Sequence, residues 1–322
     1  MKTKGTYYLI AFLIILSLNF LLPRLMAGDP LTAIYGEEVL IQMTPALKSH
    51  LVESFGIGQP LWEQFFRYLF SLIKGDIGYS FYRKTPVLKV ILSYLPWTML
   101  LMGTAFVFSI IVGIVLGIES GWRRGRKIDK SLLVAMMSFS GFPSFFVGIV
   151  FLLIFGIELG LFPFHGATTA YAGLSGMGLL WDILRHLVLP LSTLVVVFVS
   201  GDYLLTRSTM VTVVREPFVL VAKAKGLTDR KIRYRHAGRN SLIPVVTATG
   251  VRFGSMIVSG ALFVEIVFSY PGMGSLVYDA LLTRDYPVLQ GCLLVITIAV
   301  LMVNLMVDLL YRKLDPRTSS AQ

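Results

Sequence analysis

The sequence is poor in charged residues, in cysteine and in histidine, and each scarcity excludes a class of protein. Only 15% of the 322 residues are charged. A soluble globular chain has about a quarter, so these charges are too few to cover a water-facing surface. The single cysteine, Cys292, cannot form a disulfide bond within the chain. The four histidines are scattered, without the clustered spacing that metal ligands require.

Two further kinds of chemistry are missing. No G-x-x-x-x-G-K-[ST] occurs, so the chain has no P-loop of its own. The tetrapeptide Gly173-Leu174-Ser175-Gly176 resembles the serine motif of intramembrane proteases, but it lies outside the apolar runs and Ser175 has no histidine partner. A net charge of +11 would suit nucleic acid, yet the aromatic residues that interleave the basic residues of a nucleic-acid groove are absent.

Hydrophobic residues make up 55% of the chain, which predicts an all-α polytopic membrane protein. Six stretches meet or approach the roughly 20 apolar residues that a helix needs to cross a bilayer. They are Thr6–Pro23, Val90–Ile118, Ser131–Ile157, about His186–Leu205, Leu242 to about Val264, and Tyr286–Val307. The first could be a cleaved signal peptide, but its length and the lack of an A-x-A-like site favour an uncleaved span. We interpret residues 160–181, which contain five glycines and a proline, as an external or re-entrant loop.

The positions of the basic residues orient these spans. Five Lys or Arg lie between Glu119 and Lys130, nine lie between Arg207 and Arg239, and three lie in the C-terminal tail. Because short basic loops stay in the cytoplasm, both termini are predicted to be cytoplasmic. The longer segment Gly28–Lys89 is then external, and its apolar and aromatic residues predict short helices that pack on the outer membrane face.

Three ionisable residues fall within or beside the predicted spans, where such residues are costly and usually functional. Asp308 lies near an inner boundary, so snorkelling or a helix-to-helix pair is its simpler interpretation. Arg252 lies well inside its span and is the best candidate for an interior polar role, while Asp202 lies near the end of its own. A proton relay would need several carboxylates at matching depth, and their absence weakens the hypothesis of a proton-driven transporter.

The basic segment of about residues 207–240 has the pattern of two short helices. Pro217 can start the first, because its missing N–H would be unpaired there anyway. Gly226 suits the left-handed position that ends it, and Thr228 is a candidate N-cap for a second helix through about His236. Such a helix could sit in a groove on a partner and pass a rotation into the membrane. The alternative is an ordinary basic loop attracted to anionic lipid, and these residues alone do not decide between the two.

This segment resembles the EAA loop of ABC importer permeases, in the form found in the dipeptide/oligopeptide/nickel permease family. The resemblance rests on Phe218-Val219, Ala222-Lys223-Ala224-Lys225-Gly226-Leu227, Arg235-His236-Ala237-Gly238-Arg239-Asn240 and Ile243-Pro244. It continues in order along nearly the whole chain, through Ala27-Gly28-Asp29-Pro30, Gly75-Asp76-Ile77-Gly78-Tyr79-Ser80, Glu265–Gly274 and Arg284-Asp285-Tyr286-Pro287. Two departures from the general motif, Phe218 in place of its glutamate and His236-Ala237 in place of its L-P, are in keeping with the peptide-type subfamily.

The resemblance implies a type I ABC importer permease fold with six transmembrane helices. Residues 1–93 would hold the first helix and the external segment, residues 94–311 the transmembrane domain with its coupling loop, and residues 312–322 a cytoplasmic tail. The chain would be a non-catalytic subunit in the cell membrane and would hold no cofactor. Its implied partners are a second homologous permease, two cytoplasmic ATPases that carry the ATP and Mg, and an external substrate-binding protein.

The resemblance also suggests functional residues. Those expected to contact the ATPases are Ala222, Ala224, Gly226, Leu227, Thr228, Asp229, Arg230, Lys231 and Ile232. Candidates for the translocation path are Ser138, Ser140, Ser144 and Arg252, although small residues equally serve close helix packing.

Two questions stay open at this point. The segment Gly28–Lys89 either forms part of the docking surface for the binding protein or packs on the outer ends of the spans. The resemblance implies that the cargo is a peptide, nickel or a related small solute. No pocket residue supports that inference. The competing hypothesis is a stand-alone secondary transporter, which would show an inverted repeat with broken helices at matching positions, and we find no such pair.

Overall fold

The computed structural model describes residues 2–25, 40–41, 43–49, 59–80, 82–242, 245, 248 and 262–314. Over these residues the chain is helical apart from loops and one short hairpin, which confirms the predicted all-α class. It divides into two compact units, residues 1–96 with 272–301, and residues 97–271 with 302–322. The boundaries fall inside two long helices, α6 (Val87–Trp122) and α14 (Tyr286–Leu314).

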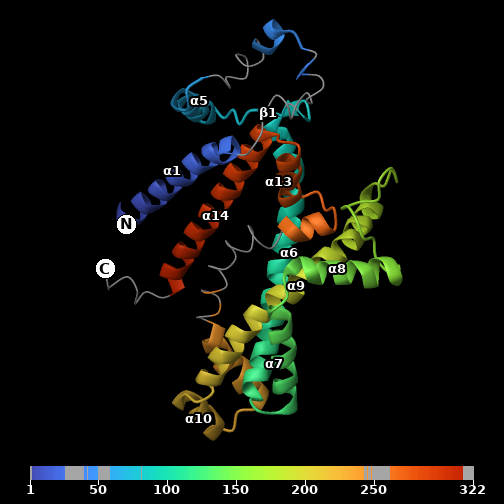
Figure 1. The fold of residues 1–322 in the computed structure, drawn as a ribbon. Helices are drawn as coiled ribbons and strands as arrows, with labels where there is room; N and C mark the ends of the chain where they lie inside the picture. Colours follow the sequence, from blue (N-terminus) through green and yellow to red (C-terminus); the bar gives the residue numbers. More distant parts are fainter. Residues whose placement is uncertain are drawn as a thin grey trace. The chain divides into compact units, whose positions relative to one another are not determined.

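The first unit combines the beginning of the chain with part of its end. It contains α1 (Lys2–Leu25), α5 (Leu61–Ile73), β1 (Tyr79–Ser80) paired antiparallel with β2 (Thr85–Pro86), the start of α6, α13 (Met273–Leu282) and most of α14 (Figure 1). Its buried core joins α6, α13 and α14, and comprises Val87, Val90, Ile91, Met273, Leu276, Ala280, Val288, Leu289 and Cys292.

Polar contacts hold the hairpin against these helices. The Ser80 hydroxyl donates to the buried Asp285 carboxylate, just before α14. Arg83, in the turn between the strands, donates to the Tyr94 hydroxyl at 3.0 Å and to Asp279 at 3.3 Å. Two segments that are far apart in the sequence are therefore fixed together in this unit.

Helix α5 is the short amphipathic helix predicted for the external segment. One side packs on α1, where the Phe20 ring lies 5.1 Å from Phe65 and 5.7 Å from Tyr68 between ring centroids. The large apolar residues Trp62, Phe66 and Phe70 are exposed. An exposed aromatic face on a short helix is typical of a helix that lies at a membrane surface.

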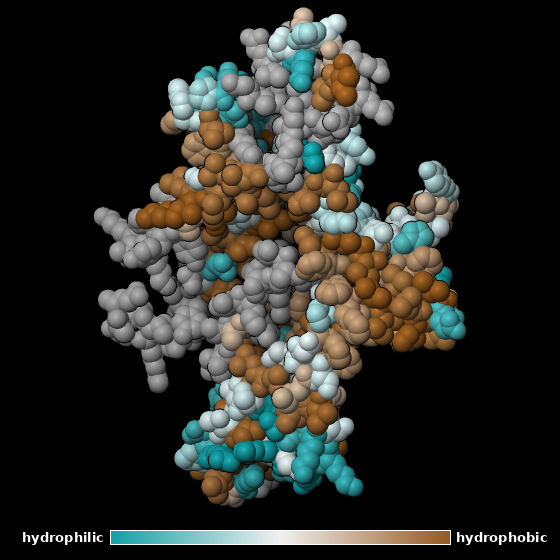
Figure 2. Space-filling model, in the orientation of Figure 1, coloured by the Kyte–Doolittle hydropathy of each residue, from teal (hydrophilic) through white to brown (hydrophobic). Residues whose placement is uncertain are grey.

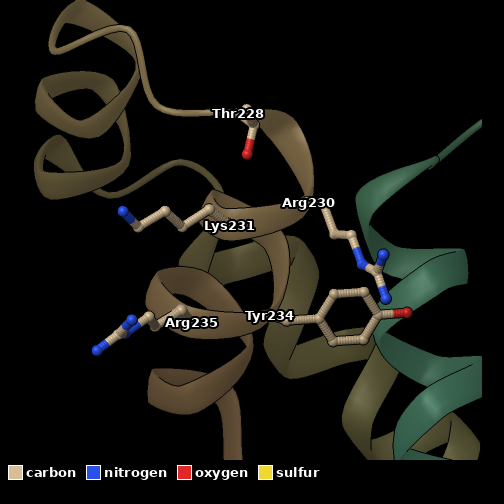
Figure 3. A pocket seen from close by; sticks show the side chains of 5 residues that line it. All are labelled: Thr228, Arg230, Lys231, Tyr234 and Arg235. Atoms are coloured by element: carbon tan, nitrogen blue, oxygen red, sulfur yellow. The ribbon is translucent and has the colours of Figure 1, made fainter.

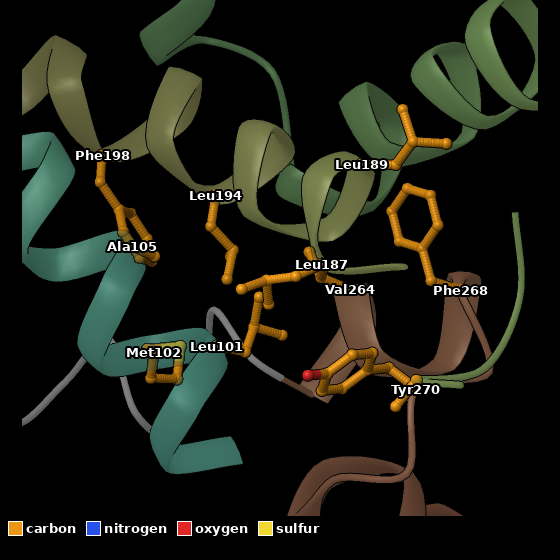
Figure 4. Close-up of a cluster of buried hydrophobic side chains, with 11 residues drawn as sticks. Leu101, Met102, Ala105, Leu187, Leu189, Leu194, Phe198, Val264, Phe268 and Tyr270 are labelled. Atoms are coloured by element: carbon orange, nitrogen blue, oxygen red, sulfur yellow. The ribbon is translucent and has the colours of Figure 1, made fainter. Parts of the chain in front are cut away.

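The second unit holds the remaining helices. They are the rest of α6, α7 (Lys127–Ser140), α8 (Ser144–Phe151), the π-helix η1 (Leu152–Glu158), α9 (Gly176–Val213), α10 (Pro217–Ala224), α11 (Asp229–Lys231), the π-helix η2 (Ile232–Gly238) and the end of α14. Its largest core lies between α6, α9 and the segment before residue 271 (Figure 4). Leu101 of α6, Leu194 of α9 and Tyr270 are all fully buried there.

Helices α6 and α9 approach closely because three glycines of α6 face α9. A Cβ atom added at Gly113 would lie 2.5 Å from the Cβ of Asp202, and one at Gly117 would lie 2.5 Å from the Cβ of Thr206. A Cβ at Gly121 would lie 2.7 Å from the Cβ of Met210. The glycines are four residues apart, so they lie on one face of α6. Small residues of this kind let membrane helices pack backbone to backbone.

The third predicted span, Ser131–Ile157, is not one continuous helix. It consists of α7 followed by α8 and η1, which are bent by 103° at residues 141–143. Pro143 explains the break, because proline cannot donate to the preceding turn and drives the residue before it out of the helical conformation.

The other predicted spans coincide with helices wherever the structure describes them. Helices α1, α6, α9 and α14 contain the first, second, fourth and sixth, and α6, α9 and α14 are long and apolar enough to cross a membrane. Our loop interpretation was wrong for residues 176–181, which form the first turns of α9. Most of the fifth span, Leu242 to about Val264, lies outside the described residues.

The surface of the second unit changes character along its length. Hydrophobic side chains cover the visible face over α8, whereas hydrophilic ones gather at the end formed by α10 and the start of α7 (Figure 2). Helix α6 has 36 residues, which corresponds to about 54 Å. The hydrocarbon core of a bilayer is about 30 Å thick, so α6 extends beyond it and carries polar residues at its end.

The glycine contact yields a first prediction. Gly117→Ala should destabilise the protein by about 1–3 kcal/mol, because the added methyl overpacks the α6–α9 contact. The matched control is Gly103→Ala in the same helix, where an added Cβ meets nothing within 4 Å. That change should be neutral or stabilising, since alanine favours a helix over glycine by about 1 kcal/mol. Thermal unfolding of both purified variants in detergent measures the difference, and equal midpoints would contradict the glycine contact.

Candidate functional site

The candidate site is the segment between α9 and the helix that follows η2, and its first half folds as its turn residues predict. Pro217 is the first residue of α10. Gly226 follows that helix with φ of +69°, the left-handed conformation that glycine adopts without strain. The N–H of Gly226 donates to the carbonyl of Lys223 at 2.9 Å and closes the end of α10.

The second half differs from its prediction in two ways. Thr228 occupies the N-cap position of α11, but its side chain makes no capping hydrogen bond. The helix also does not end at His236, because α11 runs directly into η2 and the chain stays helical to Leu242. Residues from Asp229 to Leu242 therefore form one continuous helical segment, which contains a wide π-helical part.

The inner side of this segment is apolar and packs on the ends of α6 and α9. The buried cluster there consists of Ile118, Met210, Val219, Ala222, Ile232 and Ala237. Ile232 has no exposed surface and Ala222 only 5%. Both residues were predicted to contact the ATPases. The structure places them on the inner side of the segment, in the buried cluster.

The outer side of the segment is basic. An open recess of about 440 Å³ is lined by Thr228, Arg230, Lys231, Tyr234 and Arg235 (Figure 3). No carboxylate is among these lining residues. The other residues predicted to contact a partner, Ala224, Gly226 and Asp229, are exposed nearby, and Leu227 is half-buried. The recess therefore offers positive charge and hydrogen-bond donors to a ligand or partner.

One carboxylate at the end of α6 joins this segment to the rest of the second unit. Glu119 accepts hydrogen bonds from Arg233 at 2.5 Å and from the Tyr234 hydroxyl at 2.6 Å, both on Oε1. Arg123 pairs with its other oxygen at 3.3 Å. The hydrogen bond to Glu119 raises the pKa of the Tyr234 phenol, so the phenol remains a proton donor at neutral pH. Trp122 lies beside this group, with the Arg233 guanidinium 5.6 Å from its ring centroid.

A second polar group ties α6, α7 and α9 together. Asp129 is 2% exposed, and it accepts from Arg207 Nε at 2.6 Å and from Nη2 at 2.9 Å. It also accepts from the Ser120 hydroxyl and from the backbone N–H of Gly125. Asp129 lies in the predicted cytoplasmic loop, before the apolar part of α7. The Arg207 hydrogen bonds, followed by those from Ser120 and Gly125, outweigh the effect of burial and hold the pKa of Asp129 well below its ordinary value.

The candidate path residues lie around the bend between α7 and α8. Ser138 and Ser140 are exposed near the end of α7, and Ser144 begins α8. They do not share one helix, as the sequence analysis assumed, because the bend separates them. Arg252, the fourth candidate, lies outside the described residues. Asp202 is buried in α9 against Gly113.

Glu119, Asp129 and Arg207 were not predicted from the sequence. Glu119 and Arg207 served only as bounds of the predicted cytoplasmic loops, and Asp129 was not singled out. Arg207 is 78 residues from Asp129 and Arg233 is 114 residues from Glu119 along the chain, so no local spacing could pair them. The available signal was the presence of two acidic residues, Glu119 and Asp129, at the two ends of one short basic run.

Comparison with known proteins places the chain in a family. The family described as binding-protein-dependent transport system inner membrane component matches residues 109–320, more than half of the chain. The chain belongs to this family. It is accordingly a multi-pass inner membrane component of such a transport system.

Curated relatives match nearly the whole length. The oligopeptide transport system permease protein AppB of Bacillus subtilis is 31% identical, and the di/tripeptide transport system permease protein DppB of Pseudomonas aeruginosa is 32% identical. The glutathione transport system permease protein GsiC of Escherichia coli K12 is 34% identical. In each case the match covers 93% of this chain and 92% of the relative.

A solved structure agrees on the fold. A chain from the crystal structure of an amino acid ABC transporter with histidines superposes with a TM-score of 0.51 at 13% identity. The match covers 70% of this chain and 94% of that chain. This likeness shows the fold alone.

The Asp129 group yields a second prediction. Asp129→Asn should lower the free energy of unfolding by about 3–5 kcal/mol, because it removes a buried carboxylate and leaves the partly buried Arg207 guanidinium without its charge partner. The control is Asp279→Asn, which breaks the pair with Arg83 where the carboxylate is 51% exposed. That pair should contribute only about 0–1 kcal/mol to the free energy of unfolding. Thermal unfolding in detergent compares the two variants, and a smaller loss for Asp129→Asn than for the control would refute the assignment.

Proposed function

We propose that this chain is a permease subunit of an ABC importer for peptides, and that residues 207–240 couple it to ATP hydrolysis by partner ATPases. The observation that carries the proposal is the two-sided construction of this segment. Its inner side packs on α6 and α9 through Ile232 and Ala237, and its outer side presents a basic recess. A segment built in this way can receive a force outside and pass it to the long helices.

The proposed mechanism follows from that construction. Closure of the ATPases on ATP pushes the exposed residues from Gly226 to Lys231, and the helical segment that begins at Asp229 moves with them. Because α6 and α9 are in backbone contact through their glycines, they respond as one body. The permease then changes from inward-facing to outward-facing and accepts substrate from the external binding protein. The chain itself hydrolyses nothing, in keeping with its lack of a P-loop.

The proposed cargo class rests on the relatives. AppB, DppB and GsiC are named for oligopeptide, di/tripeptide and glutathione transport, and all of these are peptides. We infer that the substrate passes along the interface with a second, similar permease. Ser138, Ser140 and Ser144 are the described candidates for contact with it.

Affinity purification tests the assembly. The tagged chain, extracted in mild detergent, should co-purify with a second permease of similar size and with P-loop ATPases. Mass spectrometry of the eluate identifies them. A chain that elutes alone and moves solute into liposomes without ATP would overturn the proposal in favour of a secondary transporter.

The left-handed glycine of the loop tests the coupling. Gly226→Val should leave membrane insertion and assembly intact but reduce substrate-stimulated ATPase activity at least tenfold. Valine is strained at φ of +69°, by about 1–2 kcal/mol, so the link between α10 and α11 must change its shape.

The matched control is Gly160→Val. This glycine also has a left-handed backbone, and an added Cβ there likewise meets nothing within 4 Å, but it lies far from the loop in sequence. Stimulated ATPase activity of the Gly160 variant should equal that of the unmodified complex. Equal stimulation in the Gly226 variant would contradict the role of the loop.

A further inference from the structure

One carboxylate, that of Glu119, forms hydrogen bonds between the end of α6 and the proposed coupling segment. Arg233 and Tyr234, neighbours in η2, both donate to Oε1 of Glu119. Arg123, one turn further along the chain, pairs with Oε2. Each carboxylate oxygen of Glu119 therefore has a partner. Oε1 is bound by the coupling segment, and Oε2 is paired with a residue just after the end of α6.

The contact is partly shielded from water, which strengthens it. The side chain of Arg233 is 13% exposed and that of Glu119 is 24% exposed. The Arg233 guanidinium also lies over the Trp122 ring, and Lys223 of α10 approaches the same ring at 5.6 Å. A charge-assisted hydrogen bond in such a setting is stronger than an exposed ion pair. Apart from the Glu119 contacts and the two cations over Trp122, the described residues of this interface pack through the apolar cluster, and such contacts have no preferred direction.

The contact also lies at the right place to transmit a movement. On one side, the helical segment is continuous from Asp229, beside the basic recess, to Arg233 and Tyr234. On the other side, α6 is continuous from Glu119 back through Gly117 and Gly113, where it contacts α9. If the segment rotated about its own axis, its apolar side chains would slide over the cluster. Arg233 and Tyr234 would instead pull directly on the Glu119 carboxylate.

We propose that Glu119 is a positioning residue for energy coupling, the point at which movement of the coupling segment is transmitted to α6. This inference rests on the proposed function. It differs from a purely structural role in one measurable respect. A structural residue affects how much protein is folded, whereas Glu119 sets how much ATP hydrolysis is linked to transport in the folded complex.

The test uses the complete complex in lipid nanodiscs, with ATPase activity measured with and without the substrate-loaded binding protein. Glu119→Gln keeps the size of the side chain and removes its charge. We expect a small fall in its thermal unfolding midpoint and a basal ATPase activity, per folded complex, close to that of the unmodified complex. Stimulation by the binding protein should fall at least tenfold. Tyr234→Phe, which removes one of the two donors to Oε1, should give a smaller loss.

Three further variants separate charge pairing from general damage. Glu158→Gln removes an exposed carboxylate outside the loop and should leave stimulation unchanged. Glu119→Arg should abolish stimulation, and combining it with Arg233→Glu should restore at least part of it, since the pair is rebuilt with reversed charges.

The outcomes distinguish this inference from the proposed function. Full stimulation in Glu119→Gln would overturn the inference alone. Loss of stimulation only in proportion to loss of folded complex, or no recovery in the double variant, would assign Glu119 a structural role and also overturn it. An unmodified chain that assembles with no ATPase would overturn the proposed function, and this inference with it.

Discussion

The close approach of α6 and α9 is the constraint on which the second unit depends. Glycines at 113, 117 and 121 remove the side chains that would otherwise keep the two backbones apart. In a lipid environment the hydrophobic effect does not drive helices together, so close packing and hydrogen bonds must supply the attraction. The glycine face therefore determines where α9 can lie, and with it the position of each group that α9 carries.

The polar groups at the end of this contact follow from it. Met210 of α9 lies against Gly121. The preceding turn of α9 therefore places Arg207 beside Asp129. One turn earlier, the Tyr203 hydroxyl lies 2.7 Å from the Ser120 hydroxyl. The same end of α6 presents Glu119 to η2. One close contact between two helices thus organises two polar groups at its end, and these groups connect the turn before α7 and the coupling segment to the same pair of helices.

The fold was predictable where a residue has a single strong preference. Pro217 starts α10 and Gly226 adopts the left-handed conformation, as each residue's backbone chemistry requires. Long apolar runs located α6 and α14 within a few residues. The bend before α8 was missed, because hydropathy averages over Gly141 and Pro143 and does not register a break in hydrogen bonding. The start of α9 was misplaced because its first turns contain Gly176 and Gly178, and glycine is disfavoured in a helix.

The candidate site was predictable only in part. The loop's basic character and its turns are local properties, so the sequence revealed them. The partition of its residues into buried and exposed is not local, and Ile232 shows why. It stands in a run of charged residues that suggests an exposed helix, yet it is completely buried against the ends of α6 and α9. Pairings such as Glu119 with Arg233 depend on the whole fold and leave no trace in spacing.

The spacing of the glycines has a consequence for how this chain can diverge. Point substitutions at exposed positions of α6 leave the contact with α9 unchanged. A deletion of one residue before Gly113 is different, because it rotates everything after it by about 100° relative to the preceding helix. The three glycines would leave the α9 face together, and bulky neighbours would replace them. We therefore expect related chains to vary freely in loop length while keeping α6 free of insertions and deletions up to its last glycine of this face, Gly121.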